Sequence, residues 1–297
     1  MSLKKIFTSI NPYLKLIRFD RPIGTLLLLW PTLWALWLAA DGIPPLNYLL
    51  IFSLGVFLMR SAGCVINDIA DRKFDGQVKR TRNRPLAQNQ IPVINALIFF
   101  VVLMLCALVL LAFLNPLSIK IAMVAAFFAI TYPFMKRYTY LPQIYLGIAF
   151  ALSIPMAFAQ IKNSIPAVAW LLFIANIFWT TAYDTMYAMV DRDDDEKIGV
   201  KSTAILFGDL DIVITHIIQG FMLVSLLLLG KKLELNFYYY ISLLLVVLLF
   251  IYQNKLLRSR DSGNYFKAFL NNNWVGLIVF AGIFLAKLDS LALSDMN

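Results

Sequence analysis

Residues 59–87 read MRSAGCVINDIADRKFDGQVKRTRNRPLA, and this stretch joins an apolar run to a dense group of charged residues. Within it, Asn67, Asp71 and Asp75 follow one another at intervals of four residues. If the apolar run continues as a helix, this interval places the three side chains on one helix face. The stretch therefore predicts a row of oxygen ligands at the end of a long apolar helix, with a cluster of Lys and Arg directly after it.

A second acidic row lies in residues 183–199, which read YDTMYAMVDRDDDEKIG. Asp184, Tyr187, Asp191 and Asp195 are separated by three, four and four residues, which is again the spacing of one helix face. Neighbouring carboxylates on one face repel each other unless a cation lies between them. The two rows together predict one shared site for divalent cations.

The composition is that of an integral membrane protein. Hydrophobic residues make up 61% of the chain and charged residues 14%, and the mean hydropathy is +0.76; soluble domains have about 45–50% apolar and about 25% charged residues. Cys64 and Cys106 both lie in apolar runs, so we expect no disulfide framework. The N-terminal residues resemble neither a signal peptide nor a transit peptide, which favours a bacterial inner membrane.

Nine apolar runs are long enough to cross a bilayer. They cover residues 23–40, 47–67, 94–114, 118–135, 143–160, 165–190, 212–230, 236–253 and 272–290. We therefore expect a single all-α transmembrane domain over residues 1–297, with nine helices around a central cavity and short cap helices at the cytoplasmic face.

The positive charges predict how this bundle is oriented. Most of the 26 Lys and Arg residues fall in the segments on the N-terminal side of the membrane. The positive-inside rule therefore places the N-terminus and both acidic rows at the cytoplasmic face, and the C-terminus in the periplasm. Because the net charge of +9 lies at membrane edges, we expect no nucleic-acid partner.

The residue types at the acidic rows indicate the ligand. Oxygen ligands without a nearby His or Cys suit Mg²⁺ better than zinc, and Mg²⁺ commonly completes its shell with substrate phosphates. Basic residues suited to a diphosphate surround both rows: they are Arg72, Lys73, Lys79, Arg80, Arg84, Lys136, Arg137 and Lys201. We therefore expect a lipid diphosphate, with its head group at the membrane edge and its tail in the bilayer.

Arg60 lies inside an apolar run, about two helical turns before Asn67. A cation at membrane depth is costly and usually faces the interior of the bundle, where it has a partner. Two interpretations stay open. Arg60 either holds the carboxylate of a substrate or pairs with Asp184.

These motifs resemble those of the UbiA superfamily of intramembrane aromatic prenyltransferases. The pattern Asn67-Asp68-x-x-Asp71-x-x-x-Asp75 and the segment that ends in Asp191-x-x-x-Asp195 are similar to its paired acidic motifs. Longer segments resemble the branch of that family that acts on 4-hydroxybenzoate in ubiquinone biosynthesis: DRPIGTLLLLWPTLWAL, MRSAGCVINDIADRKFDG, NRPLA, YPFMKRYTYLPQ and AYDTMYAMVDRDDDEKIGVKSTAILFG. The resemblance covers residues 16–279 and implies a nine-helix bundle that opens sideways to lipid.

The resemblance also implies roles for individual residues. The catalytic and metal-binding carboxylates are Asp71, Asp75, Asp191 and Asp195, with Asn67 as a further metal ligand, and they hold two Mg²⁺ ions that bridge the diphosphate. The diphosphate is bound by Asn67, Arg72, Lys73, Tyr132, Lys136 and Arg137. For the aromatic acid we expect contacts from Arg60, Asp184 and Tyr187.

The implied reaction moves a polyprenyl group from polyprenyl diphosphate to the ring carbon ortho to the hydroxyl of 4-hydroxybenzoate. The ring proton then leaves to the diphosphate or to a carboxylate such as Asp191. Three alternatives compete with this reading: another acceptor, such as homogentisate, naphthoate or haem; a cation transporter; and a non-catalytic lipid-binding scaffold. Carboxylates gathered at one membrane face argue against the transporter. We expect contact with membrane lipid and no obligate protein partner.

Overall fold

The computed structural model describes residues 11–294, with side chains as far as residue 289, and this part of the chain forms helices and turns without strands. The helices are α2 (Ile23–Ala40), α3 (Leu46–Asp71), η1 (Asp75–Gln77), α4 (Val93–Leu111), α5 (Pro116–Tyr138), α6 (Pro142–Ala151), α7 (Ser153–Lys162), α8 (Ala167–Ile198), α9 (Thr203–Phe207), η2 (Gly208–Leu210), α10 (Asp211–Lys232), α11 (Phe237–Leu257) and α12 (Ser262–Ser294). They provide nine membrane spans within the described residues, because α6 and α7 share one span and α9 to α10 form another. The predicted all-α bundle of nine transmembrane helices is confirmed.

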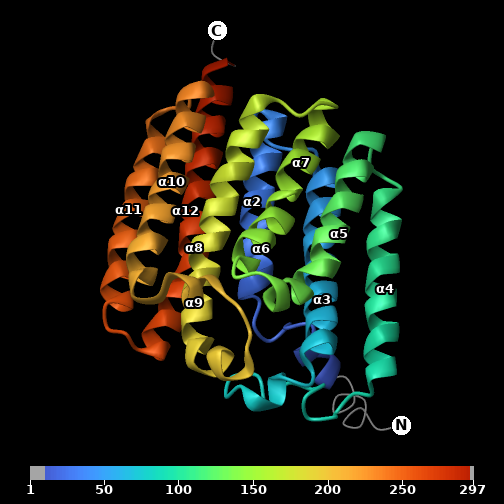
Figure 1. Ribbon diagram of the computed structural model, residues 1–297. Coiled ribbons are helices and arrows are strands. Elements are labelled where there is room, and N and C mark those ends of the chain that lie inside the picture. Colours follow the sequence, from blue (N-terminus) through green and yellow to red (C-terminus); the bar gives the residue numbers. More distant parts are fainter. Residues whose placement is uncertain (1–10, 295–297) are drawn as a thin grey trace.

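Helix α8 lies in the middle of the bundle. It packs against α10 and α12 on one side and against α6 and α7 on the other, while α4 and α11 lie at opposite edges (Figure 1). Its 32 residues extend for about 48 Å, which exceeds the hydrocarbon thickness of about 30 Å. The helix is therefore longer than the hydrocarbon layer is thick, and the second acidic row lies in its C-terminal half.

The C-terminal ends of α3, α5 and α8 lie at the same end of the bundle (Figure 1). The short helices η1 and α9 lie at this end as well. Helix α8 stops at Gly199, whose φ of +72° is the left-handed conformation that glycine adopts without strain, and Val200 N–H then donates to the Asp195 carbonyl. That this end faces the cytoplasm stays a prediction.

Buried tryptophans hold α8 against α2 and α12. The rings of Trp34 and Trp179 stack with their centroids 5.1 Å apart. Trp34 Nε1 donates to the Gly276 carbonyl and Trp179 Nε1 donates to Asn272 Oδ1, each at 3.0 Å. Because an indole N–H inside a membrane protein needs an acceptor, these bonds fix the rotation of the three helices as well as their spacing.

An ion pair joins α2 to α12 at the opposite end of the bundle. The Lys287 ammonium donates to Asp41 Oδ1 at 2.5 Å, and this hydrogen bond lowers the pKa of Asp41 although burial opposes the shift. Because the pKa of Asp41 is lower in the folded state, the pair stabilises the fold at pH values above the ordinary pKa of an Asp side chain. The contribution is lost as the pH falls through the folded-state pKa.

We therefore expect Asp41→Asn to lower the thermal midpoint in detergent at pH 7 and to lose this effect in acid. The change at pH 7 should be small, because the Asp41 side chain is 73% exposed. Tryptophan fluorescence during heating measures both midpoints. A difference between the two proteins that stays constant as the pH falls would contradict the role of the charge.

Candidate active site

Two cavities meet between the helices that carry the acidic rows. The larger measures about 510 Å³ and has mainly apolar walls, whereas the smaller measures about 150 Å³ and is lined by acidic and basic side chains. Six residues line both: Asn67, Arg80, Arg84, Tyr132, Asp184 and Tyr187. They form a polar junction between an apolar cavity inside the bundle and a charged cavity at its end.

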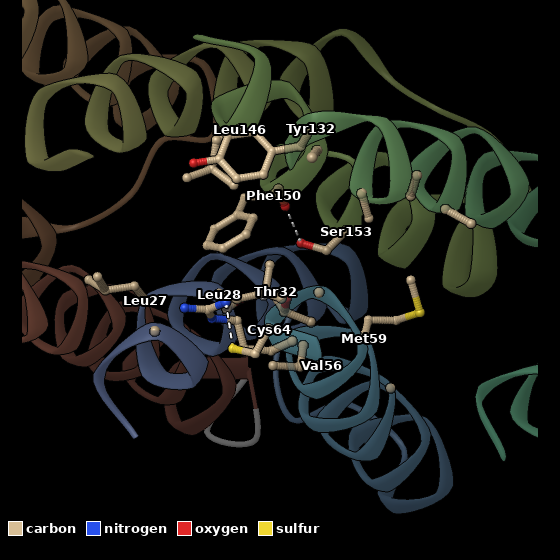
Figure 2. Close-up of a pocket in the computed structure, with 18 of the residues that line it drawn as sticks. Leu27, Leu28, Thr32, Val56, Met59, Cys64, Tyr132, Leu146, Phe150 and Ser153 are labelled. Atoms are coloured by element: carbon tan, nitrogen blue, oxygen red, sulfur yellow. Dashed lines mark hydrogen bonds between the residues drawn. The ribbon is translucent and has the colours of Figure 1, made fainter. Parts of the chain in front are cut away.

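Figure 2 shows two facing walls of the larger cavity. One wall comes from α2 and α3, and the other from α5, α6 and α7. The first carries Leu28, Thr32, Val56, Met59 and Cys64, and the second carries Tyr132, Leu146, Phe150 and Ser153. The cavity thus lies between helices that are far apart in the sequence.

The first acidic row is not one continuous helix face. Helix α3 ends at Asp71, and Asp75 lies in the separate 3-10 turn η1, so the prediction of a helix through Asp75 is wrong. Contacts from the following loop explain the break, because Arg84 Nη1 donates to both carboxylate oxygens of Asp75 at 3.0 Å and Thr81 Oγ1 donates to the Asp75 carbonyl. Asp75 nevertheless lines the same smaller cavity as Asn67 and Asp71.

Arg84 joins two buried carboxylates. It lies 3.0 Å from Asp75 and 3.1 Å from Asp68, and Arg18 donates to both oxygens of Asp68 at 2.8 and 3.0 Å. Burial raises the pKa of Asp75, and the Arg84 guanidinium partly offsets this shift. Burial lowers the pKa of Arg84, but the negative charges of Asp68 and Asp75 raise it by more. Arg84 therefore stays a cation. Nothing in the sequence distinguishes Arg18 from the other basic residues near the N-terminus.

The second acidic row is a continuous face of α8. Asp184, Tyr187, Asp191 and Asp195 all line the smaller cavity. Arg80 binds Asp191 through Nε at 2.9 Å and through Nη2 at 2.5 Å, and its guanidinium lies 4.4 Å from the centre of the Tyr187 ring. Both rows therefore open into one space, and the loop after α3 spans the gap between them.

The basic residues of the site differ in part from those expected. Lys136 pairs with Asp71 and lines the smaller cavity, and Arg137 donates to the Ala70 carbonyl at 2.7 Å beside it. Arg72 and Lys73 are exposed and line neither cavity, because the chain turns away from α3 directly after Asp71. The structure places Arg80 and Arg84 at the junction where we expected Arg72 and Lys73.

Arg60 lines the larger cavity beside the junction. Its Nη1 donates to Cys64 Sγ at 3.0 Å, and its buried Nε has no hydrogen-bond partner among the described side chains. Within residues 11–289 no ion pair joins Arg60 to Asp184, so the structure does not contain the pairing that the sequence left open. Arg60 is therefore a cation in the cavity wall that has no carboxylate partner among the described residues.

The model of the UbiA prenyltransferase family matches residues 28–286. The chain belongs to this family. It is 56% identical to the 4-hydroxybenzoate octaprenyltransferase of Saccharophagus degradans over 96% of this chain and 95% of that protein, and 58% identical to the one of Aeromonas hydrophila over 91% and 94%.

Solved structures of UbiA homologs share the fold. A UbiA homolog from Aeropyrum pernix K1 superposes with a TM-score of 0.78 at 23% identity, over 89% of this chain and 98% of that one. A UbiA homolog from Archaeoglobus fulgidus, bound to GPP and Mg²⁺, superposes with a TM-score of 0.73 at 16% identity, over 94% and 99%. The bundle seen here is therefore the UbiA architecture.

The UbiA site offers oxygen donors to a cation. Seven acidic or amide side chains line the smaller cavity, namely Asn67, Asp71, Asp75, Gln143, Asp184, Asp191 and Asp195, and its lining within the described residues includes neither His nor Cys. Oδ1 of Asp71 is buried and has no hydrogen-bond partner there. This donor set fits a hard divalent cation.

Basic side chains pair with three of these carboxylates. In the described part of the chain no three of them form a metal-binding group, because Asp71, Asp75 and Asp191 are each paired with Lys136, Arg84 or Arg80.

Proposed function

We propose that this protein is a multi-pass membrane enzyme that transfers a polyprenyl group from polyprenyl diphosphate to 4-hydroxybenzoate. The products are 3-polyprenyl-4-hydroxybenzoate and diphosphate, and the reaction belongs to ubiquinone biosynthesis. Relatives that are more than half identical carry the name 4-hydroxybenzoate octaprenyltransferase. The observation that carries the proposal is the junction between an apolar cavity and a charged cavity, since a lipid diphosphate has the same two parts.

The charged cavity is suited to the diphosphate. In this structure Arg80 pairs with Asp191, Lys136 pairs with Asp71, and Arg84 pairs with both Asp75 and Asp68. When a diphosphate enters, these three cations turn to its oxygens and release Asp191, Asp75 and Asp71. Arg binds phosphate oxygens in the same bidentate manner as carboxylate oxygens, so Arg80 and Arg84 stay paired with an anion while the released carboxylates become free to bind a metal ion.

The released carboxylates are suited to Mg²⁺, as the oxygen-only donor set indicates. The metal would be held from both sides of the cavity, by Asn67, Asp71 and Asp75 on one side and by Asp191 and Asp195 on the other. Two acidic rows suit two ions. Bound there, Mg²⁺ supplies charge stabilisation for the departing diphosphate. Arg80, Arg84 and Lys136 add positive charge to the same leaving group as the allylic C–O bond breaks.

The apolar cavity holds the prenyl chain, with its first carbon at the junction. Water would trap an allylic cation as an alcohol, and the apolar walls of this cavity exclude water from the reacting carbon. The aromatic ring of Tyr132 lies at the junction, where its face stabilises a carbocation, whereas the ring of Tyr187 already faces the Arg80 guanidinium.

The acceptor enters beside the junction with its carboxylate toward Arg60. This orientation pairs the acid with a cation and keeps it from Asp184, so the hydroxyl end of the ring faces the Asp184 carboxylate. Hydrogen bonding of the phenol raises the electron density of the ortho carbon, which attacks the allylic carbon. The ring proton then passes to the departed diphosphate or to Asp191, which restores the aromatic ring.

We also propose that the protein forms a single transmembrane domain and that it lies in a bacterial inner membrane. Its charged cavity faces the cytoplasm. The support is the excess of Lys and Arg in the segments at that end of the bundle.

The decisive experiment uses the purified protein in nanodiscs with 4-hydroxybenzoate and geranyl diphosphate. We expect geranylated 4-hydroxybenzoate and diphosphate in equal amounts when Mg²⁺ is present, and neither product after chelation with EDTA until Mg²⁺ is restored. Mass spectrometry of the product locates the new bond. Release of diphosphate without an alkylated acceptor would contradict the acceptor, and product formation in EDTA would contradict the metal.

A further inference from the structure

Gly24 lies directly against the guanidinium of Arg60. Gly24 is the second residue of α2, whereas Arg60 belongs to α3. A Cβ atom at Gly24 would lie 2.5 Å from Arg60 Nε, 2.5 Å from Nη2 and 2.8 Å from Cζ. These distances are too short for any side chain, so the guanidinium occupies the space that a methyl group at residue 24 would fill.

Cys64 holds the other side of the same guanidinium. It lies one helical turn after Arg60, and Arg60 Nη1 donates to its Sγ at 3.0 Å. Cys64 faces Tyr132 and Phe150 across the larger cavity (Figure 2). A thiol is a weak acceptor, so this contact fixes the direction of the guanidinium without neutralising its charge.

We propose that Gly24 positions the Arg60 guanidinium for the carboxylate of the aromatic acceptor, with Cys64 as a second positioning contact. The proposal rests on the proposed function, because it assumes an acceptor with an acid group. The Arg60 guanidinium lines the larger cavity beside the backbone of Gly24, and its Nε has no hydrogen-bond partner among the described residues. Residue 24 thus selects for acceptors that carry a negative charge.

An alanine at residue 24 should move Arg60 and leave the fold unchanged. The backbone of Gly24 is not in the left-handed region, so alanine fits its conformation. The three atoms nearest to the added Cβ all belong to the flexible end of Arg60 and none to the backbone. The guanidinium can therefore swing away at little cost, and helix α2 gains a residue with a better helix propensity.

The test is steady-state kinetics of Gly24→Ala in nanodiscs. We expect the KM for 4-hydroxybenzoate to rise about 10-fold or more, as the loss of a charge-assisted hydrogen bond predicts. The KM for geranyl diphosphate and the thermal midpoint should stay within error of the wild type. Gly220→Ala in α10 is the matched control, because nothing lies within 4 Å of a Cβ there.

Two further measurements separate positioning from a general disturbance. With 4-hydroxybenzamide, which lacks the charge, Gly24→Ala should have the same KM as the wild type. In the background of Arg60→Ala, the change at residue 24 should add little, because alanine has no side-chain atoms beyond Cβ to be displaced. Equal KM increases for the acid and the amide, or additive effects of the two substitutions, would overturn the proposal.

The wild type and the variant report on different claims. If the wild type does not alkylate 4-hydroxybenzoate, the proposed function fails and the positioning role fails with it. If the wild type is active and Gly24→Ala has an unchanged KM for the acid, the proposed function stands and the role of Gly24 is overturned.

Discussion

Asp191→Asn should lower kcat for prenyl transfer by about 10²- to 10³-fold, the usual loss when a group that stabilises the leaving charge is removed. Asp191 lies on the cavity face of α8 and is the carboxylate that Arg80 binds through two nitrogens. The amide keeps the size of the side chain and removes the charge that a divalent cation requires. Rates of diphosphate release and of aromatic product formation measure the effect.

Asp193→Asn is the control for this substitution. Asp193 is exposed and lies two residues further along α8, on a different face of the helix from Asp191. The Asp193→Asn variant should keep the wild-type rate of prenyl transfer. The half-saturating Mg²⁺ concentration should rise for Asp191→Asn and stay constant for Asp193→Asn. Equal losses in both variants would show that charge near the membrane edge matters and that the cavity face does not.

Much of the fold follows from the sequence because the bilayer constrains it. Every backbone polar group in hydrocarbon must be paired, so an apolar run of about 20 residues has to be a helix. The nine spans are predictable on this ground alone. The course of α8 past the hydrocarbon is predictable as well, since Asp184, Asp191 and Asp195 keep a helical spacing without a break.

The loop after α3 is where prediction from the sequence fails. Outside the hydrocarbon the helix is no longer obligatory, and contacts from Thr81 and Arg84 turn the chain at Asp75. These partners lie six and nine residues ahead, beyond any local helical pattern. Proximity in sequence therefore favours Arg72 as a site residue, whereas the returning loop brings Arg84 into the cavity.

The contact between Gly24 and Arg60 illustrates a different limit. Each residue stands out in the sequence, one inside a motif and the other as a cation in an apolar run. Their adjacency depends on how α2 packs against α3, and no spacing along the chain encodes that packing. A glycine that leaves room for a distant side chain is recognisable only in three dimensions.

Asp211→Asn should destabilise the protein by about 3 kcal/mol, which is at the lower end of the cost of removing one partner from a buried ion pair. Asp211 is the first residue of α10 and is fully buried. It pairs with Arg192 of α8, and it accepts from Arg260 Nη1 at 2.9 and 3.0 Å. The substitution keeps the volume and leaves two guanidinium groups without their common counterion.

The thermal midpoint in detergent measures this loss. Asp209→Asn is the control, because Asp209 is exposed and gives Arg260 only its backbone carbonyl, which the substitution retains. Arg260→Ala should cost less than Asp211→Asn, since the Arg260 side chain is 43% exposed and Arg192 keeps its pairing. Equal midpoints for Asp209→Asn and Asp211→Asn would contradict the structural role of the cluster.

The same substitution connects stability to the reaction. Arg192 follows Asp191 directly, so its pairing with Asp211 fixes the rotation of α8 where the helix leaves the hydrocarbon. Without that pairing, the last turns of α8 are free to rotate, and Asp191 and Asp195 no longer face Asp71 and Asp75 across the cavity. The folded fraction of Asp211→Asn should therefore need more Mg²⁺ for half-maximal activity, although Asp211 touches neither substrate. A normal Mg²⁺ requirement in that variant would limit Asp211 to a role in stability.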